Sequence, residues 1–170
     1  GIKVFSSNYP LYGDMSNRVM TILEKYSPNL EVYSIDEAFL QFKGFDLFDL
    51  EQEGHRMRKQ VRQWTGIPVS VGIAPTKTLA KVANRMAKKY KKDGVFLMKE
   101  PATITHVLKH VAVDELWGVG RKYSKFLSQR GFQTAYDLVN ASESWIKNNM
   151  TVNGLRMIKE LKGIPCLALE

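Results

Sequence analysis

Cysteine is nearly absent from this 170-residue chain, which contains Cys166 alone. A single cysteine excludes a disulfide within the chain and argues against a cysteine-based zinc site. The sequence also lacks any apolar run close to the roughly 20 residues that a membrane-spanning helix needs, and its start shows no signal-peptide pattern. We therefore expect a protein of the reducing cytoplasm with no membrane partner.

Histidine is scarce as well, and the three present do not suggest a catalytic or metal site. His106 and His110 stand four residues apart on a predicted helix, a spacing that can bind zinc. No glutamate follows His106 in the metalloprotease pattern, and no third ligand is suggested. Neither a Ser-His-Asp nor a Cys-His arrangement can be argued from the sequence. We interpret the histidines as surface or packing residues.

Acidic residues are outnumbered, with 17 aspartates and glutamates against 25 lysines and arginines. The net charge of +8 and the pI of about 9.5 predict a preference for polyanions, either nucleic acid or an acidic surface. Basic residues gather near the end of a helix predicted to begin at Thr76, where they also suit the helix dipole, so this cluster by itself is weak support for DNA binding. Its members are Arg85, Lys88, Lys89, Lys91 and Lys92.

Two adjacent carboxylates, Asp36 and Glu37, interrupt a strand-forming run at 32–39. In a buried strand such a pair would be strongly destabilising unless a cation lay beside it, and Mg²⁺ is the usual partner of carboxylate oxygens. Side chains alternate across a strand, so both carboxylates can reach one cation only at a strand bend or a hairpin tip. The alternative is a half-solvated sheet in which Glu37 lies at the surface and Asp36 caps a turn. Spacing alone leaves both interpretations open.

Lys77 stands where a predicted buried strand at 68–74 runs into a helix. Thr76 is the expected N-cap of that helix. A lysine in the first turn opposes the helix dipole and would be better placed beside an anion such as phosphate, since helix N-termini bind anions. The alternative is a solvated lysine at a mildly unfavourable position.

Alternating strand and helix patterns predict an α/β unit in the first part of the chain. The expected helices lie at about 14–26, at 49–64 and from 76 onward, and the expected strands at 30–42 (a strand or hairpin), 68–74 and 94–98. After Met98 only short helical patterns separated by glycine and asparagine remain, so we expect a domain boundary at 99–101.

The stretch at 113–122 predicts a helix, a tight turn and a second helix. Gly118 and Gly120 permit positive φ and a close backbone approach, and Val119 between them would anchor the turn in the core. The pattern resembles a helix-hairpin-helix motif, in which hairpin amides and a helix N-terminus hold a DNA phosphate while Arg121 and Lys122 add charge. The alternative is a glycine turn that only packs two helices together.

Several segments, taken in order through the whole chain, resemble the palm of Y-family translesion DNA polymerases. The strongest are YSIDEAF at 33–39 and VGIAPTKTLAK at 71–81. The segment FSSNYPLYGDMSNRV at 5–19 and the late PCL at 165–167 resemble the bacterial UmuC/MucB/ImpB branch of that family. Agreement among separate motifs is a far more specific signal than any one of them.

The resemblance implies an α+β fold, with an incomplete ferredoxin-like polymerase palm at 1–98 and a small all-helical thumb with a helix-hairpin-helix motif at 99–170. It implies that Asp36 and Glu37 hold the two Mg²⁺ ions of nucleotidyl transfer and that Lys77 contacts the incoming triphosphate. One metal would lower the pKa of the primer 3′-hydroxyl while the other neutralises the departing pyrophosphate. The DNA-binding residues would be Gly118, Val119, Gly120, Arg121 and Lys122.

The sequence departs from the family pattern in three features that cannot be located in it: the metal-binding aspartate of the first palm strand, the fingers and the little finger. The chain enters the pattern at 2–5 without an initiator methionine, and it stops at Glu170. We therefore expect a palm-and-thumb fragment of a DNA-directed DNA polymerase, a nucleotidyltransferase, that is inactive or very weak alone.

The resemblance further implies error-prone synthesis past DNA damage, in DNA repair and the SOS response. The implied partners are primer-template DNA, damaged DNA, dNTPs, a UmuD-like protein, a recombinase filament and the sliding clamp. An alternative of another class is a non-catalytic basic DNA-binding or interaction module in which the acidic pair does nothing. A helix-hairpin-helix glycosylase or nuclease is a weaker third choice, because it leaves the α/β unit without a role.

Overall fold

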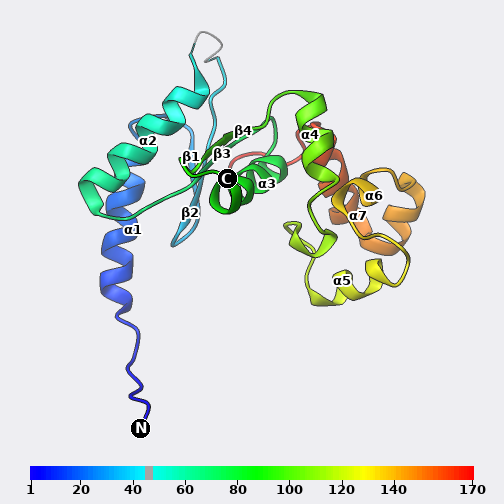
Figure 1. The fold of residues 1–170 in the computed structure, drawn as a ribbon, viewed down its shortest axis with the longest axis horizontal. Coiled ribbons are helices and arrows are strands. Elements are labelled where there is room, and N and C mark those ends of the chain that lie inside the picture. Colours follow the sequence, from blue (N-terminus) through cyan, green and yellow to red (C-terminus); the bar gives the residue numbers. More distant parts are fainter. Residues whose placement is uncertain (45–47) are drawn as a thin grey trace. The chain divides into compact units, whose positions relative to one another are not determined.

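The computed structural model describes residues 1–44 and 48–170. Within these ranges the chain forms seven α-helices, one short 3₁₀ turn and four strands; the α-helices and strands are labelled in Figure 1. It divides into two compact units, of which the first comprises Gly1–Asp49, Arg56–Val69 and Leu169–Glu170 and the second comprises Leu50–His55 and Ser70–Ala168. The predicted α+β class is confirmed, since helices accompany one antiparallel and one parallel pair of strands.

Helix α1, Tyr9–Leu23, belongs to the first unit and starts five residues before the predicted position. Asn8 caps it, because the Asn8 side chain accepts a hydrogen bond from Leu11 N over 3.2 Å, and a proline occupies the first turn. The prediction of a start near 14 was wrong because the apolar stripe on which it depended begins only there. The stripe contributes Val19 and Ile22 to a small core around the fully buried Val61.

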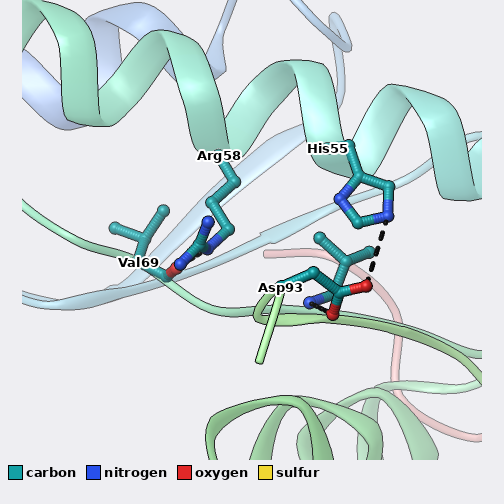
Figure 2. A network of polar contacts seen from close by, with 5 residues as sticks. His55, Arg58, Val69 and Asp93 are labelled. Atoms are coloured by element: carbon teal, nitrogen blue, oxygen red, sulfur yellow. Dashed lines mark hydrogen bonds and ion pairs between the residues drawn. The ribbon is translucent and has the colours of Figure 1, made fainter. Parts of the chain in front are cut away.

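The rest of the first unit is a hairpin and most of helix α2. Strand β1, Leu30–Ser34, pairs antiparallel with β2, Glu37–Leu40, which confirms the predicted hairpin at 30–42. Helix α2, Leu50–Thr65, matches the prediction to within one residue at each end. Arg58 Nε on this helix donates to the Val69 carbonyl over 3.0 Å, which fastens the segment after the helix (Figure 2).

In the second unit, β3, Val71–Ile73, pairs in parallel with β4, Val95–Leu97. Helix α3, Lys77–Tyr90, connects the two strands, as a parallel pair requires. The turn before β4 carries Asp93, whose carboxylate lies 3.8 Å from His55 Nε2 on α2. Figure 2 shows these two side chains facing each other. The predicted strand–helix–strand unit from 68 to 98 is thereby confirmed, with shorter strands than expected.

The chain after β4 is mainly helical. Its elements are α4, Pro101–Leu108; the 3₁₀ turn Val113–Glu115; α5, Arg121–Ser128; α6, Ala135–Val139; and α7, Glu143–Leu161. A kink interrupts α7 at Thr151, a non-glycine residue with φ of 65°. These helices share one core with α3, in which Leu79, Leu127 and Ile158 are almost completely buried.

The predicted boundary at 99–101 falls inside the second unit, and the division into domains 1–98 and 99–170 stays a prediction. Among the described helices, none combines the length and the apolar character needed to cross a membrane.

Candidate functional site

The acidic pair lies at the tip of the β1–β2 hairpin. Ser34 pairs with Glu37 across the two strands, and the register shifts between Val32 and Ser34. Ile35 and Asp36 form the turn, so Asp36 lies in the turn itself and Glu37 is the first residue of β2. Because successive side chains of a strand point to opposite faces, two neighbouring carboxylates can approach one cation only at a bend or a hairpin tip. Asp36 and Glu37 lie at such a tip.

Both carboxylate side chains are exposed, which matches the half-solvated alternative and not the buried strand. The physical reason is that a two-residue turn takes Asp36 out of the strand pleat and places Glu37 at the edge of a sheet that has two strands in the described residues. The Ser34 hydroxyl donates to Asp36 Oδ1 over 2.7 Å and fixes that side chain against the turn. Desolvation therefore gives no argument for a bound cation here.

Carboxylate oxygens at a hairpin tip are of the kind that Mg²⁺ takes as ligands. Within 1–44 and 48–170, however, no group of three or more histidine, cysteine, aspartate or glutamate side chains is placed to hold a metal ion. Asp36 and Glu37 thus fit Mg²⁺ in chemistry but provide only part of a ligand set. The same geometry also matches the alternative of a turn aspartate beside a surface glutamate.

Lys77 is the first residue of α3 and belongs to the second unit, whereas the acidic pair belongs to the first. Thr76 caps the helix as predicted, with its hydroxyl accepting from Leu79 N over 3.3 Å. The partly buried Lys77 side chain reaches the end of the second unit, where Nζ donates to the Ala168 carbonyl over 2.6 Å. A carbonyl of the chain itself thus holds this ammonium group.

An anion does lie at the start of α3, and it comes from the protein. Glu160 on α7 is fully buried, and its Oε2 accepts from Thr78 N, in the first turn of α3, over 3.0 Å. Sequence reasoning missed this residue and assigned the anion to phosphate. No local signal distinguished it, because the last turns of α7 also carry the charged Arg156 and Lys159, although a glutamate is almost never fully buried without partners.

The turn at 116–120 has the features expected of a backbone that approaches a ligand closely. Gly118 adopts φ of 89°, whereas Gly120 keeps a negative φ and serves as the N-cap residue of α5 without a side-chain cap. Val119 is 7% exposed and anchors the turn in the core, as predicted. Arg121 and Lys122 are exposed in the first turn of α5. The element before the turn is a single 3₁₀ turn and not the α-helix that was predicted.

The basic cluster on α3 is partly engaged within the protein. Arg85 pairs with Glu115, and Lys89 Nζ lies 3.8 Å from the same carboxylate. Hydrogen bonding to Tyr90, followed by the charges of Tyr90 and Glu115, raises the pKa of Lys89. The cluster therefore contributes less free positive charge than its sequence suggests.

The sequence comparisons point to one family. The sequence model of the impB/mucB/samB family matches residues 1–85. The UmuC protein of Salmonella typhimurium is 46% identical over 173 residues, which cover 100% of this chain and 41% of UmuC. DNA polymerase IV of Sulfurisphaera tokodaii is 31% identical over 144 residues, which cover 82% of this chain and 39% of that protein. The chain thus spans about two fifths of the length of these curated relatives.

The structural comparison agrees. A solved insertion ternary complex of Dbh DNA polymerase matches this structure with a TM-score of 0.77 and 26% sequence identity, and the match covers 96% of this chain and 47% of Dbh. The fold described above is therefore similar, over nearly its whole length, to about half of a solved DNA polymerase.

Proposed function

Because this chain belongs to the impB/mucB/samB family, we propose that it supplies the palm and thumb functions of an error-prone translesion DNA polymerase that acts in DNA repair and the SOS response. The observation that carries the proposal is the 46% identity with UmuC across the whole chain. The similarity to a DNA polymerase ternary complex supports it independently. In this proposal 1–98 form the ferredoxin-like palm and 99–170 the thumb.

Asp36 and Glu37 would supply metal ligands. Their place at one hairpin tip and their carboxylate chemistry support this role. When bound, Mg²⁺ ions would lower the pKa of the primer 3′-hydroxyl and neutralise the departing pyrophosphate. The hydrogen bond from Ser34 to Asp36 Oδ1 holds this carboxylate at the hairpin tip.

Lys77 would contact the incoming triphosphate. The Lys77 ammonium donates to the Ala168 carbonyl, and a group with three donors can bind more than one acceptor. A charged lysine held at a fixed point is suited to bind a phosphate as a point charge. The support for this role is the position of Lys77 in the family motif at 71–81 together with this fixed placement.

The turn at 116–120 would hold a DNA phosphate in the manner of a helix-hairpin-helix motif. Support comes from the positive φ of Gly118, the buried anchor Val119 and the uncapped start of α5. Arg121 and Lys122 would add charge beside the phosphate without reading sequence. From the resemblance of this chain to the family, we also propose a UmuD-like protein, a recombinase filament and the sliding clamp as partners.

A DNA-binding assay with added nucleotide tests the proposal. Fluorescence anisotropy of a labelled primer-template would be measured with Mg²⁺ and either the dNTP that pairs with the next template base or one that does not. The matching dNTP is expected to tighten binding, and Lys77→Ala is expected to abolish that effect while leaving DNA binding in place. Lys92→Ala, which removes an exposed lysine of the cluster on and just after α3, is the matched control and should behave as wild type.

The alternative function gives a different result in the same assay. DNA binding that ignores the metal, the identity of the dNTP and the Lys77 side chain would overturn the polymerase proposal. It would identify these residues as a non-catalytic basic DNA-binding module.

A further inference from the structure

A buried glutamate joins the start of α3 to the segment that follows α7. The Glu160 side chain has no exposed surface, and each of its carboxylate oxygens accepts hydrogen bonds from the backbone. Oε2 accepts from Thr78 N over 3.0 Å, while Oε1 accepts from Cys166 N over 2.7 Å and from Leu167 N over 3.1 Å. Three backbone donors from two separate segments thus converge on one carboxylate.

The main chain of Glu160 strengthens the same connection. Thr76, the N-cap of α3, donates its hydroxyl to the Glu160 carbonyl over 2.8 Å. The first turn of α3 is therefore held by α7 through both the backbone and the side chain of one residue. A buried carboxylate in this setting needs every one of its donors, because each unpaired polar group in a dry interior is destabilising.

Lys77 belongs to one of the segments that Glu160 fixes, the first turn of α3, and its side chain contacts the other. Its backbone precedes Thr78, whose amide is bound by Glu160, and its ammonium group is bound by the carbonyl of Ala168, the residue after Leu167. Glu160 thus binds the residue that follows Lys77 and the two residues just before Ala168, whose carbonyl binds the ammonium group. All of these residues belong to the second unit.

We propose that Glu160 is a positioning residue for Lys77: it fixes both the first turn of α3 and the 166–168 segment, and so holds the Lys77 ammonium at one point. The consequence for triphosphate binding rests on the proposed function, whereas the effect of Glu160 on the position of the Lys77 ammonium does not. Glu160→Gln is a sharp test, because a glutamine has one acceptor oxygen. In either orientation its NH₂ group would face at least one of the three backbone N–H donors.

The experiment measures the rate at which an amine-reactive ester labels Lys77, resolved by mass spectrometry, in the wild type, in Glu160→Gln and in Glu143→Gln. Glu143 is the exposed glutamate of the first turn of α7 and provides the matched control. Labelling of Lys77 relative to Lys81, one turn further along α3, separates a local release from a general loosening of the helix. We expect about tenfold faster labelling of Lys77 in Glu160→Gln, because the loss of one hydrogen bond to a charged group changes an equilibrium by about this factor. We expect no change in Glu143→Gln.

A Lys77 rate within error of the wild type in folded Glu160→Gln would overturn the inference. If that variant does not fold, Glu160→Asp, which keeps the charge and shortens its reach, takes its place with the same expectation. Failure of both variants to fold would also overturn it, because Glu160 would then serve general stability.

A second arm adds inorganic triphosphate and Mg²⁺ to the wild type and asks whether they protect Lys77 from labelling. Protection supports the triphosphate role. Faster labelling in Glu160→Gln without triphosphate protection in the wild type would uphold the connection between Glu160 and Lys77 and count against the proposed function.

Discussion

Gly72 on β3 lies so close to the backbone of α3 that an added methyl group has no space. A Cβ built at this position would lie 2.0 Å from Asn84 N, 2.5 Å from the Ala80 carbonyl oxygen and 2.6 Å from the Ala83 carbonyl carbon. The first separation falls about 1.4 Å short of the 3.4 Å at which ordinary van der Waals contact begins. These atoms belong to a helix backbone and cannot rotate away, so Gly72→Ala must push α3 off the sheet.

We expect Gly72→Ala to lower the free energy of unfolding by about 3 kcal/mol or more, the upper end for overpacking, because a whole helix must shift. For a chain of this size that is a fall in melting temperature of roughly 6–12 °C. Thermal and urea denaturation followed by circular dichroism measure it. Gly13→Ala is the matched control, since Gly13 lies in α1 with no atom within 4 Å of its added Cβ and should gain about 0.5–1 kcal/mol from helix propensity. A Gly72→Ala protein as stable as the wild type would refute the reasoning.

Three further predictions concern the helical part of the chain. Hydrogen bonds from Thr134 hold the pKa of Asp137 below its usual value, so the stabilisation is present above the ordinary aspartate pKa and is lost as the pH falls through the lowered value; Asp137→Asn should therefore melt earlier at pH 7 and no earlier than wild type in strong acid. Gly118→Val should weaken binding of a DNA duplex. The control Gly66→Val, at a glycine with a similar φ of 76°, should carry the same strain of about 1–2 kcal/mol and leave DNA affinity unchanged. Equal DNA affinities of the two variants would disprove the role of the turn at 116–120. Lys122→Ala should reduce the slope of log affinity against log salt by about 1, and an unchanged slope would exclude a phosphate contact.

The family and much of the fold could be predicted because their signals are local. Each of the motifs at 33–39 and 71–81 is an unbroken stretch of sequence, and the comparisons confirm the family that the two motifs indicated. Thr76 marks the start of α3 because its own side chain caps the helix, and the helical spacing of the apolar residues in α3 does not depend on distant residues. The hairpin that carries Asp36 was predicted only as a strand or a hairpin at 30–42, and the pairing of β1 with β2 decides for the hairpin.

The errors arose where distant residues decide the outcome. Glu160 occupies the anion site of α3 from 82 positions away in the sequence, a connection that no local pattern contains. The exposure of Asp36 and Glu37 depends on how many strands join their sheet, which a single strand cannot reveal. The start of α1 at Tyr9 depends on the Asn8 cap, which outweighs the absence of an apolar stripe in the first turn.

The metal-binding role of the hairpin tip is the central claim, and one titration tests it most directly. Mg²⁺ and Mn²⁺ would be titrated by calorimetry into the wild type, Asp36→Ala and the control Asp114→Ala, which removes another exposed aspartate, each with a primer-template duplex and dNTP present. After subtraction of the heat of metal binding to the duplex and dNTP without protein, the account predicts protein-dependent binding in the wild type and the control and none in Asp36→Ala. Equal binding in all three proteins, or binding in none of them, would contradict it.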